Sequence, residues 1–203
     1  MSTVIVPDDK PTIQEAVDTV AENGTVLVQD GTYTENVNIE HNGITIIALG
    51  EVILNGSTLG GIGFKIMANQ SKIIGFKITN YGVGIAINDS DNEIINNVTT
   101  QNYITGIVIN QDNNRLINNT ITNNNLGVII NESYSELTRN TINHNNDDGI
   151  IIREGTNNQL TKNITTNNGG NGINIIGNNN QLTNNKANQN KDEYGIFIRG
   201  DNN

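Results

Sequence analysis

The feature that most constrains this chain is a four-residue segment, Gly-aliphatic-x-aliphatic, that returns at a nearly constant interval. The spacings between successive copies are 22, 21, 22, 23 and 23 residues. The six copies begin at Gly84, Gly106, Gly127, Gly149, Gly172 and Gly195. A period of this length is typical of a solenoid, in which each repeat is stacked on the next. The alternation of apolar and polar residues inside each repeat indicates strands rather than helices.

A second strand recurs with the same period and explains the 41 asparagines among 203 residues. It contains an inward aliphatic residue at Ile73, Ile94, Leu116, Leu137, Leu160 and Leu182. Asn follows three residues later at Asn97, Asn119, Asn140, Asn163 and Asn185, and eight residues later at Asn102, Asn124, Asn145, Asn168 and Asn190. Asn tolerates a left-handed turn, and its amide can bond to equivalent amides above and below. We therefore predict ordered corners joined by Asn ladders, in preference to a disordered tract.

The predicted fold is an all-β parallel β-helix. A unit of about 22 residues has room for three short strands and three turns, and it buries its apolar side only when stacked on its neighbours. We expect about nine coils over residues 25–203, which gives a rod of roughly 40 Å. Three earlier segments, beginning at Thr25, Gly43 and Gly63, are expected to continue the Gly-aliphatic column toward the N-terminus.

Residues 1–24 are predicted to form an N-terminal strand and a capping helix of the same domain. Thr12 and Glu15 are spaced as a capping box, and Gly24 is a suitable stop. Ile13, Ala16, Val17 and Val20 fall on one helical face. Such a helix would cover the strand edges and apolar residues of the first coil.

Composition excludes several functions. The formal net charge of −10 argues against a nucleic-acid partner, because phosphate binding needs a basic surface. No apolar run approaches the roughly 18 residues of a membrane span, so membrane insertion is not expected. The opening sequence, MSTVIVPDDK, has no basic start or apolar stretch and does not read as a signal peptide. The absence of Cys excludes disulfides and thiolate metal sites.

The segment TIQEAVDTVAENGTVLVQDGTYTENVNI resembles the N-terminal signature of the pectin-lyase-like superfamily of right-handed parallel β-helices. The later coils resemble the repeats of polysaccharide lyases, polygalacturonases, alginate epimerases, phage tail spikes and NosD-type proteins. The resemblance covers essentially the whole chain and implies a single-stranded right-handed solenoid. It also suggests an extracellular or surface-associated location and a polysaccharide or other glycan as partner. One fold hosts many activities, so it does not fix the function.

One coil offers the best group of catalytic candidates: His144, Asp147, Asp148 and Arg153. Two carboxylates with a nearby base suit glycoside hydrolysis, and a carboxylate with an Arg suits proton abstraction beside a uronate. The Gly-His-Gly, Arg-x-Lys and Asp-Pro-His motifs found in enzymes of the superfamily are missing. Asp147 and Asp148 are also suited to a turn before Gly149, with no catalytic role.

Acidic residues stack at another turn and form a candidate carbohydrate-binding edge. The column contains Asp89, Glu132 and Glu154, with Asp112 beside it. Oxygen ligands at coil spacing could hold calcium or bond to sugar hydroxyls, and the alternative is a solvated edge. Tyr103 and Tyr134 lie near these turns and could stack on a sugar ring. We assign no metal site and no required cofactor.

The outward position of the Gly-aliphatic strand is unusually apolar. Val108, Ile129 and Ile151 occupy it in consecutive coils, and Phe197 follows near the end. An exposed apolar stripe is typical of a contact surface, although strand propensity alone also favours these residues. Self-association is therefore predicted through this stripe or through the last, open coil.

These features favour a rod that binds carbohydrate or assembles with itself, as a surface or structural module without a clear catalytic motif. The alternative is an enzyme, a lyase, glycoside hydrolase or epimerase, that acts on acidic polysaccharide. A structural oligomer with no glycan role is the third hypothesis.

Overall fold

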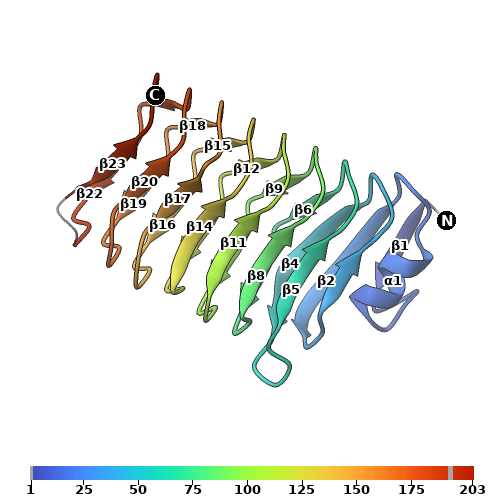
Figure 1. Cartoon of the computed structure of the whole chain (residues 1–203). Coiled ribbons are helices and arrows are strands. Elements are labelled where there is room, and N and C mark those ends of the chain that lie inside the picture. The colour runs from blue at the N-terminus through green and yellow to red at the C-terminus, as the bar shows by residue number, and fades with distance from the viewer. Residues whose placement is uncertain (1, 192–193) are drawn as a thin grey trace.

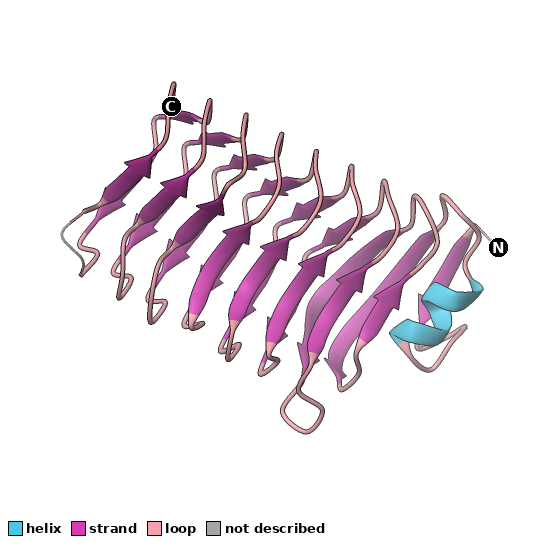
Figure 2. Ribbon diagram, viewed as in Figure 1, coloured by secondary structure: helices cyan, strands magenta, loops and turns pink. Residues whose placement is uncertain are grey.

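The structure, a computed structural model that describes residues 2–191 and 194–203, is a β-solenoid of about nine turns with one short helix at its N-terminal end (Figure 1). Nearly all regular structure is parallel strand, and the coils lie side by side along one axis (Figure 2). The sequence prediction of the fold class is confirmed.

Each regular coil presents three strands, which stack into three faces. The first face contains β6 (Lys72–Ile74), β9 (Glu93–Ile95), β12 (Arg115–Ile117), β15 (Glu136–Thr138), β18 (Gln159–Thr161) and β21 (Gln181–Thr183). The second face contains β7 (Lys77–Thr79), β10 (Val98–Thr100), β13 (Thr120–Thr122), β16 (Thr141–Asn143), β19 (Ile164–Thr166) and β22 (Lys186–Asn188). Two long strands, β2 (Thr25–Tyr33) and β4 (Thr45–Asn55), and β1 (Thr3–Val6) complete this 15-stranded sheet.

The third face is a separate eight-stranded sheet. It contains β3 (Val37–Ile39), β5 (Ile62–Ile66), β8 (Val83–Ile87), β11 (Thr105–Ile109), β14 (Leu126–Ile130), β17 (Ile150–Arg153), β20 (Ile173–Ile176) and β23 (Ile196–Arg199). The recurrent Gly-aliphatic segment forms this face in six of these strands. We name the three corners by the faces that they join: corner 1–2, corner 2–3 and corner 3–1.

The register of the first coils corrects one sequence prediction. Only the segment that begins at Gly63 continues the Gly-aliphatic column, as β5. Thr25 pairs with Thr45, and Thr45 pairs with Lys72, so β2 and β4 continue the first face instead. The strand that extends the third face toward the N-terminus is β3, whose Asn38 pairs with Lys65.

The early coils turn corner 1–2 in a different way from the later ones. Strand β4 pairs with β6 through its first residues and with β7 through its last, so one strand crosses the corner. Gly50 lies in the middle of this strand with a φ of 94°, a backbone conformation that favours glycine. From β9 onward a left-handed residue before the ladder Asn takes over this bend, namely Asn96, Asn118, Arg139, Lys162 or Asn184. This change is why the repeat is hard to see earlier in the sequence.

The N-terminal helix, α1 (Ile13–Thr19), lies over the first coil as predicted. The Thr12 hydroxyl accepts the backbone N–H of Glu15 at 3.1 Å. No hydrogen bond among the described residues joins the Glu15 carboxylate to the Thr12 N–H, so the reciprocal half of the expected capping box is not formed. The Glu35 carboxylate instead accepts the next two N–H groups, those of Ile13 and Gln14, at 3.0 and 2.8 Å. The apolar face of the helix is buried. Glu35, a residue of the first coil, thus caps the N-terminus of the helix that covers this coil.

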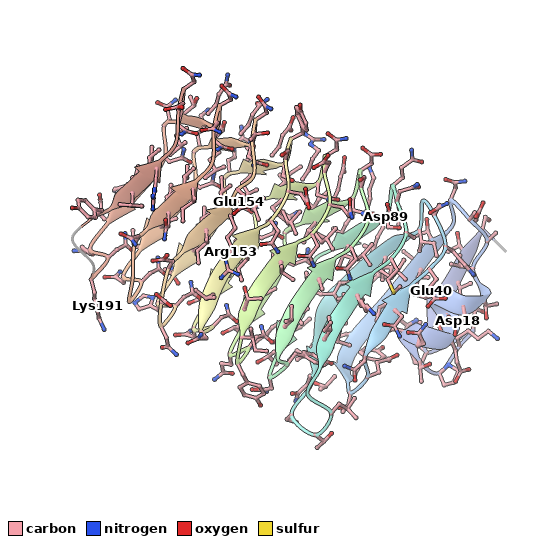
Figure 3. All side chains as sticks on the ribbon, in the orientation of Figure 1. Asp18, Glu40, Asp89, Arg153, Glu154 and Lys191 are labelled. Atoms are coloured by element: carbon pink, nitrogen blue, oxygen red, sulfur yellow. The ribbon has the colours of Figure 1, made fainter. Side chains whose placement is uncertain are left out.

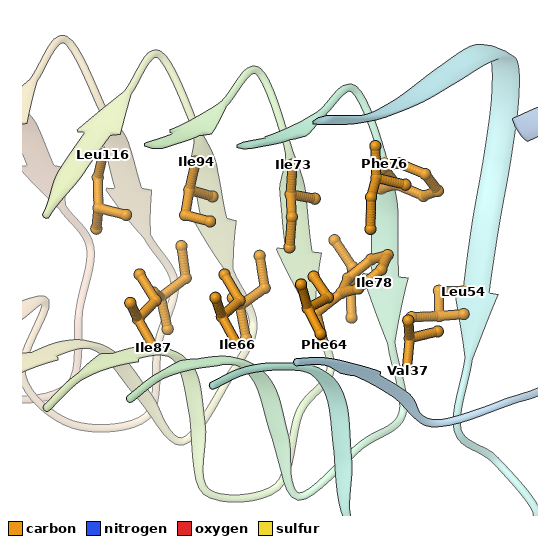
Figure 4. Close-up of a cluster of buried hydrophobic side chains, with 14 of the residues drawn as sticks. Val37, Leu54, Phe64, Ile66, Ile73, Phe76, Ile78, Ile87, Ile94 and Leu116 are labelled. Carbon is orange, nitrogen blue, oxygen red and sulfur yellow. The ribbon is translucent and has the colours of Figure 1, made fainter. Parts of the chain in front are cut away.

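The core is a narrow column of aliphatic side chains between the three faces (Figure 4). Each coil supplies inward residues in register with those of its neighbours, as Ile73, Ile94 and Leu116 do on the first face. These three side chains are fully buried. Larger groups fill the wider N-terminal part, where Phe64 and Phe76 pack edge to face with ring centroids 5.1 Å apart.

Asn ladders run along all three corners. Those at corner 1–2 and corner 2–3 contain the ten asparagines predicted from the sequence. The third ladder, at corner 3–1, contains Asn92, Asn114, Asn158, Asn180 and Asn203, with Ser71 and Ser135 at interrupted positions. The residue before each ladder Asn has a left-handed backbone, for example Asn118 with a φ of 56°. Turn formation and ladder bonding are therefore divided between two neighbouring residues.

The ladder bonds have one direction along the axis. The backbone N–H of Asn119 donates to Oδ1 of Asn140 at 2.9 Å, and that of Asn140 donates to Oδ1 of Asn163 at 3.0 Å. In each case the donor lies one coil nearer the N-terminus. The side chain amide also donates backward, as Nδ2 of Asn140 does to the Leu116 carbonyl at 2.9 Å. Buried amides are thus hydrogen-bonded, as burial requires.

Candidate functional site

A hollowed surface lies at corner 2–3, where two columns of side chains flank the buried ladder. The first column consists of the left-handed residues Gln101, Asn123, His144, Asn167 and Gln189, with φ between 53° and 57°. The second column lies two residues later and consists of Tyr103, Asn125, Asn146, Gly169 and Lys191. These turns follow the lower edge of the molecule in Figure 1, beyond the long loop between β4 and β5.

Two adjoining hollows, both open to solvent, lie between these columns. One measures about 430 Å³ and is lined by Gln101, Asn102, Tyr103, Asn123, Asn125 and Asn146. The other measures about 450 Å³ and is lined by Asn123, His144, Asn145, Asn146, Asn167, Gly169, Gln189 and Lys191. Because they share Asn123 and Asn146, the hollows form one surface, the corner groove, that follows the axis over five coils.

The lining of the corner groove is dominated by amides. Amide side chains offer both donors and acceptors without charge. Among the described residues, the ionisable groups on the lining are Tyr103, His144 and Lys191. Figure 3 shows Lys191 at the C-terminal end of the groove, away from Arg153 and Glu154.

Three groove residues occupy a backbone region that is unfavourable for their type. Asn is the residue that best tolerates a left-handed conformation after Gly. Gln101, His144 and Gln189 adopt it with φ of 57°, 53° and 56°. The same conformation occurs at the other two corners, for example in Tyr134, Arg139 and Lys162, so it belongs to the repeated turn. The side chains of Gln101, His144 and Gln189 are exposed.

The four catalytic candidates are distributed over one coil. His144 and Asp147 are exposed at corner 2–3, and Asp148 lies at the start of the third-face strand. Arg153 is exposed at the other end of β17, five residues from Asp148, which corresponds to about 15 Å of extended strand. Among the described residues, no hydrogen bond or ion pair joins any two of the four.

Asp148 is held by two asparagines of the next coil. Only 6% of the residue is exposed. Its Oδ1 accepts the backbone N–H and Nδ2 of Asn171 at 2.5 and 3.1 Å, and its Oδ2 accepts Nδ2 of Asn174 at 2.7 Å. Oδ1 of Asn171 and Oδ1 of Asn174 are buried and have no hydrogen-bond partner within residues 2–191 and 194–203. Asp148 therefore anchors the third face between two coils.

The acidic candidates lie at corner 3–1. Asp89 and Asp112 are half-buried and accept the backbone N–H groups of Ser90 and Ser133, both at 2.8 Å. Glu132 and Glu154 are exposed. Tyr134 is 55% exposed at this corner, whereas Tyr103 is 63% exposed in the corner groove. The structure thus does not bring the two tyrosines into one site.

The outward apolar stripe is far less exposed than predicted. Ile129 and Ile151 are 7% and 8% exposed, and Val108 and Phe197 are half-buried. The register is as expected, because Val108 pairs with Ile129 and Ile129 with Ile151. The Ile129 side chain is flanked by its equivalents in the coils above and below, Val108 and Ile151. The expectation of an open apolar stripe is therefore wrong in its exposure.

The described ranges, 2–191 and 194–203, contain no group of three or more His, Cys, Asp or Glu side chains placed to hold a metal ion. Within the same ranges no helix is long and apolar enough to cross a membrane.

Comparison with known families gives a match over residues 60–203 to the model described as the right-handed β-helix region. This match covers most of the chain. The protein belongs to the right-handed β-helix family. Comparison with curated protein sequences gives no match.

Solved structures share the fold of this β-helix protein at low sequence identity. The pectate lyase Pel9A is 19% identical, with a TM-score of 0.76 over 92% of this chain and 62% of its own. The Dettilon tailspike protein gp208 is 15% identical, with a TM-score of 0.77 over 98% of this chain and 46% of its own. The A-module of the Azotobacter vinelandii mannuronan C-5 epimerase AlgE4 is 12% identical, with a TM-score of 0.59 over 98% and 79%. This chain thus spans less than two thirds of the lyase and of the tailspike.

Sequence reasoning found one end of the corner groove, through Tyr103, and one central residue, His144. It missed Gln101, Asn123, Asn167 and Gln189. These residues share a position in the repeat, one residue before the ladder Asn, and this regularity was the available signal. Their identities vary between Gln, Asn and His, so the column does not stand out as a motif.

Proposed function

We propose that this β-helix protein is a non-catalytic carbohydrate-binding module whose site is the corner groove. The observation that carries the proposal is the pair of adjoining hollows lined by amides, with an exposed tyrosine at one end. Amides can match sugar hydroxyls, which are also both donors and acceptors, and an aromatic ring can cover the apolar face of a sugar. Similar folds in a pectate lyase and an alginate epimerase are consistent with a polysaccharide partner.

The test is binding of the intact chain to a glycan array, followed by calorimetry on the best ligands. Binding that is lost in a Tyr103→Ala, Asn146→Ala double variant supports the proposal. These side chains are exposed, so the variant is expected to stay folded, which circular dichroism checks. An array without signal contradicts the proposal.

Self-association is the second part of the proposal. The last coil exposes two apolar residues of one strand, since Ile196 and Ile198 of β23 are 39% and 43% exposed. We expect light scattering to give a mass above that of the monomer, and Ile198→Lys to lower it. A fall in mass with Ile129→Lys, Ile151→Lys instead would place the contact on the stripe. A monomer mass for the unmodified chain at all concentrations contradicts self-association.

A further inference from the structure

We propose that the corner groove selects an extended, uncharged glycan and contacts about one sugar residue per coil. This inference rests on the proposed function and specifies the ligand class of the same site. It follows from the spacing, the charge and the asymmetry of the groove.

The spacing of the groove matches a linear chain of sugars. Stacked strands lie about 4.8 Å apart, so each groove column repeats at that distance. This is close to the length of one pyranose residue in an extended 1,4-linked chain. Backbone bonds keep the coils in register, as in the contact of 2.9 Å between the Asn146 N–H and the Asn124 carbonyl. A regular polymer can therefore make a similar contact at each coil.

The charge of the groove favours a neutral polymer. Asn123, Asn146 and Asn167 supply uncharged donors and acceptors on successive coils. A polyuronate would bring one carboxylate per sugar, and each would need a cation or several N–H donors. Of the lining residues that the structure describes, Lys191 alone carries a positive charge independent of pH near neutrality, and it lies at the end. The net charge of −10 adds a general repulsion against polyanions.

The groove has a different contact at each end. Tyr103 and Ile104 are 63% and 56% exposed beside the N-terminal hollow, and they offer an apolar surface for a sugar ring. The middle of the groove is lined by amides, and Lys191 lines the end of the C-terminal hollow. A bound chain would thus be held by stacking at one end and by hydrogen bonds along the remaining coils.

The experiment compares soluble polysaccharides by calorimetry and affinity electrophoresis. Neutral probes are xylan, glucomannan and mixed-linkage β-glucan, and acidic probes are polygalacturonate and alginate, each with and without calcium. For the best neutral probe, oligosaccharides of two to eight residues are titrated. We expect affinity to rise with length and to level off near five residues, the number of coils in the groove.

A matched pair of variants links binding to the groove. Asn123→Gly, Asn167→Gly removes two groove amides while retaining residues that accept φ of 56°. The control, Asn179→Gly, Asn184→Gly, makes the same change at the other two corners, where φ is also 56° and both side chains are exposed. We expect the groove variant to weaken binding roughly tenfold to a hundredfold, and the control to leave it unchanged.

The outcomes separate the two proposals. Preference for polygalacturonate or alginate over every neutral probe would overturn this inference and leave a carbohydrate-binding function. Equal loss of affinity in the groove variant and its control would place the ligand elsewhere and overturn it as well. Absence of binding to all probes and to the glycan array would remove the proposed function itself.

Discussion

Replacement of Asn140 by Ala tests how much one ladder position stabilises the solenoid. Asn140 is fully buried at corner 1–2. Its Oδ1 accepts the backbone N–H and Nδ2 of Asn119 at 2.9 and 3.0 Å. Its Nδ2 donates to the Leu116 carbonyl at 2.9 Å and to Oδ1 of Asn163 at 3.0 Å. The substitution therefore removes four hydrogen bonds that join three neighbouring coils.

The expected cost follows from these bonds. Each intramolecular hydrogen bond contributes about 1 kcal/mol net, so the loss of four lowers the free energy of unfolding by about 4 kcal/mol. A buried N–H of Asn119 is also left without its acceptor. Total stabilities are about 5–15 kcal/mol, so this one change removes a large fraction. For a domain of this size we expect the melting temperature to fall by roughly 8–16 °C.

The assay is chemical and thermal unfolding followed by circular dichroism, with Asn125→Ala as the control. Asn125 is exposed, and its side chain has no hydrogen bond to a described residue. The control is expected to change the unfolding free energy by less than about 0.5 kcal/mol. If the two variants lie within about 1 kcal/mol of each other, the ladder bonds do not stabilise the fold as argued here.

Three further predictions concern an interrupted position of the ladder at corner 3–1, the buried phenol of Tyr81, and catalysis. At corner 3–1 the buried Ser135 hydroxyl has no hydrogen-bond partner among the described residues. The variant Ser135→Asn restores the ladder at this position and should raise the free energy of unfolding by about 1–2 kcal/mol. An unchanged or lower free energy of unfolding would refute this prediction. Burial, and to a smaller extent the Glu35 carboxylate, raise the pKa of Tyr81 above its usual 10.0. The neutral phenol therefore contributes its full stabilisation of the folded state below pH 10, and this contribution declines as the pH rises further. Denaturant midpoints between pH 8 and 11 should fall more steeply for the unmodified chain than for Tyr81→Phe, and parallel curves would contradict the assignment. We expect no turnover of pectic, alginate or neutral polysaccharides, with or without calcium, measured by reducing ends and unsaturated products; turnover that Asp147→Asn, Asp148→Asn abolishes would make the protein an enzyme.

The sequence predicts most of this fold because the solenoid repeats a local rule. Inward aliphatic residues and corner asparagines recur at intervals of 21 to 23 residues, so each repeat shows the same pattern of strands and corners. The prediction failed at the first coils, where Gly50 bends a continuous strand in place of a left-handed Asn. The third ladder was missed because Ser71 and Ser135 interrupt its column.

The site is less predictable than the fold, because it depends on how far neighbouring coils cover each side chain. Ile129 points outward as its position in the strand requires, yet neighbouring side chains cover it. In the corner groove the backbone conformation is shared while the residue type changes from Gln101 to Asn123 to His144. A sequence shows residue types directly, but it shows a shared conformation only when the same residue is used each time.

The one-directional ladder makes the coils interchangeable. A corner that carries a ladder Asn offers a backbone N–H on its C-terminal side and a side-chain oxygen on its N-terminal side, so such coils join in the same way. Duplication of a segment that carries an Asn at all three corners, such as 98–119, would reproduce all three joints and lengthen the rod by about 4.8 Å. Duplication of a segment that begins inside a strand but ends off this register would leave a mismatched joint. The length of the rod, and with it the number of coils in the groove, can therefore change in whole units without redesign of the core.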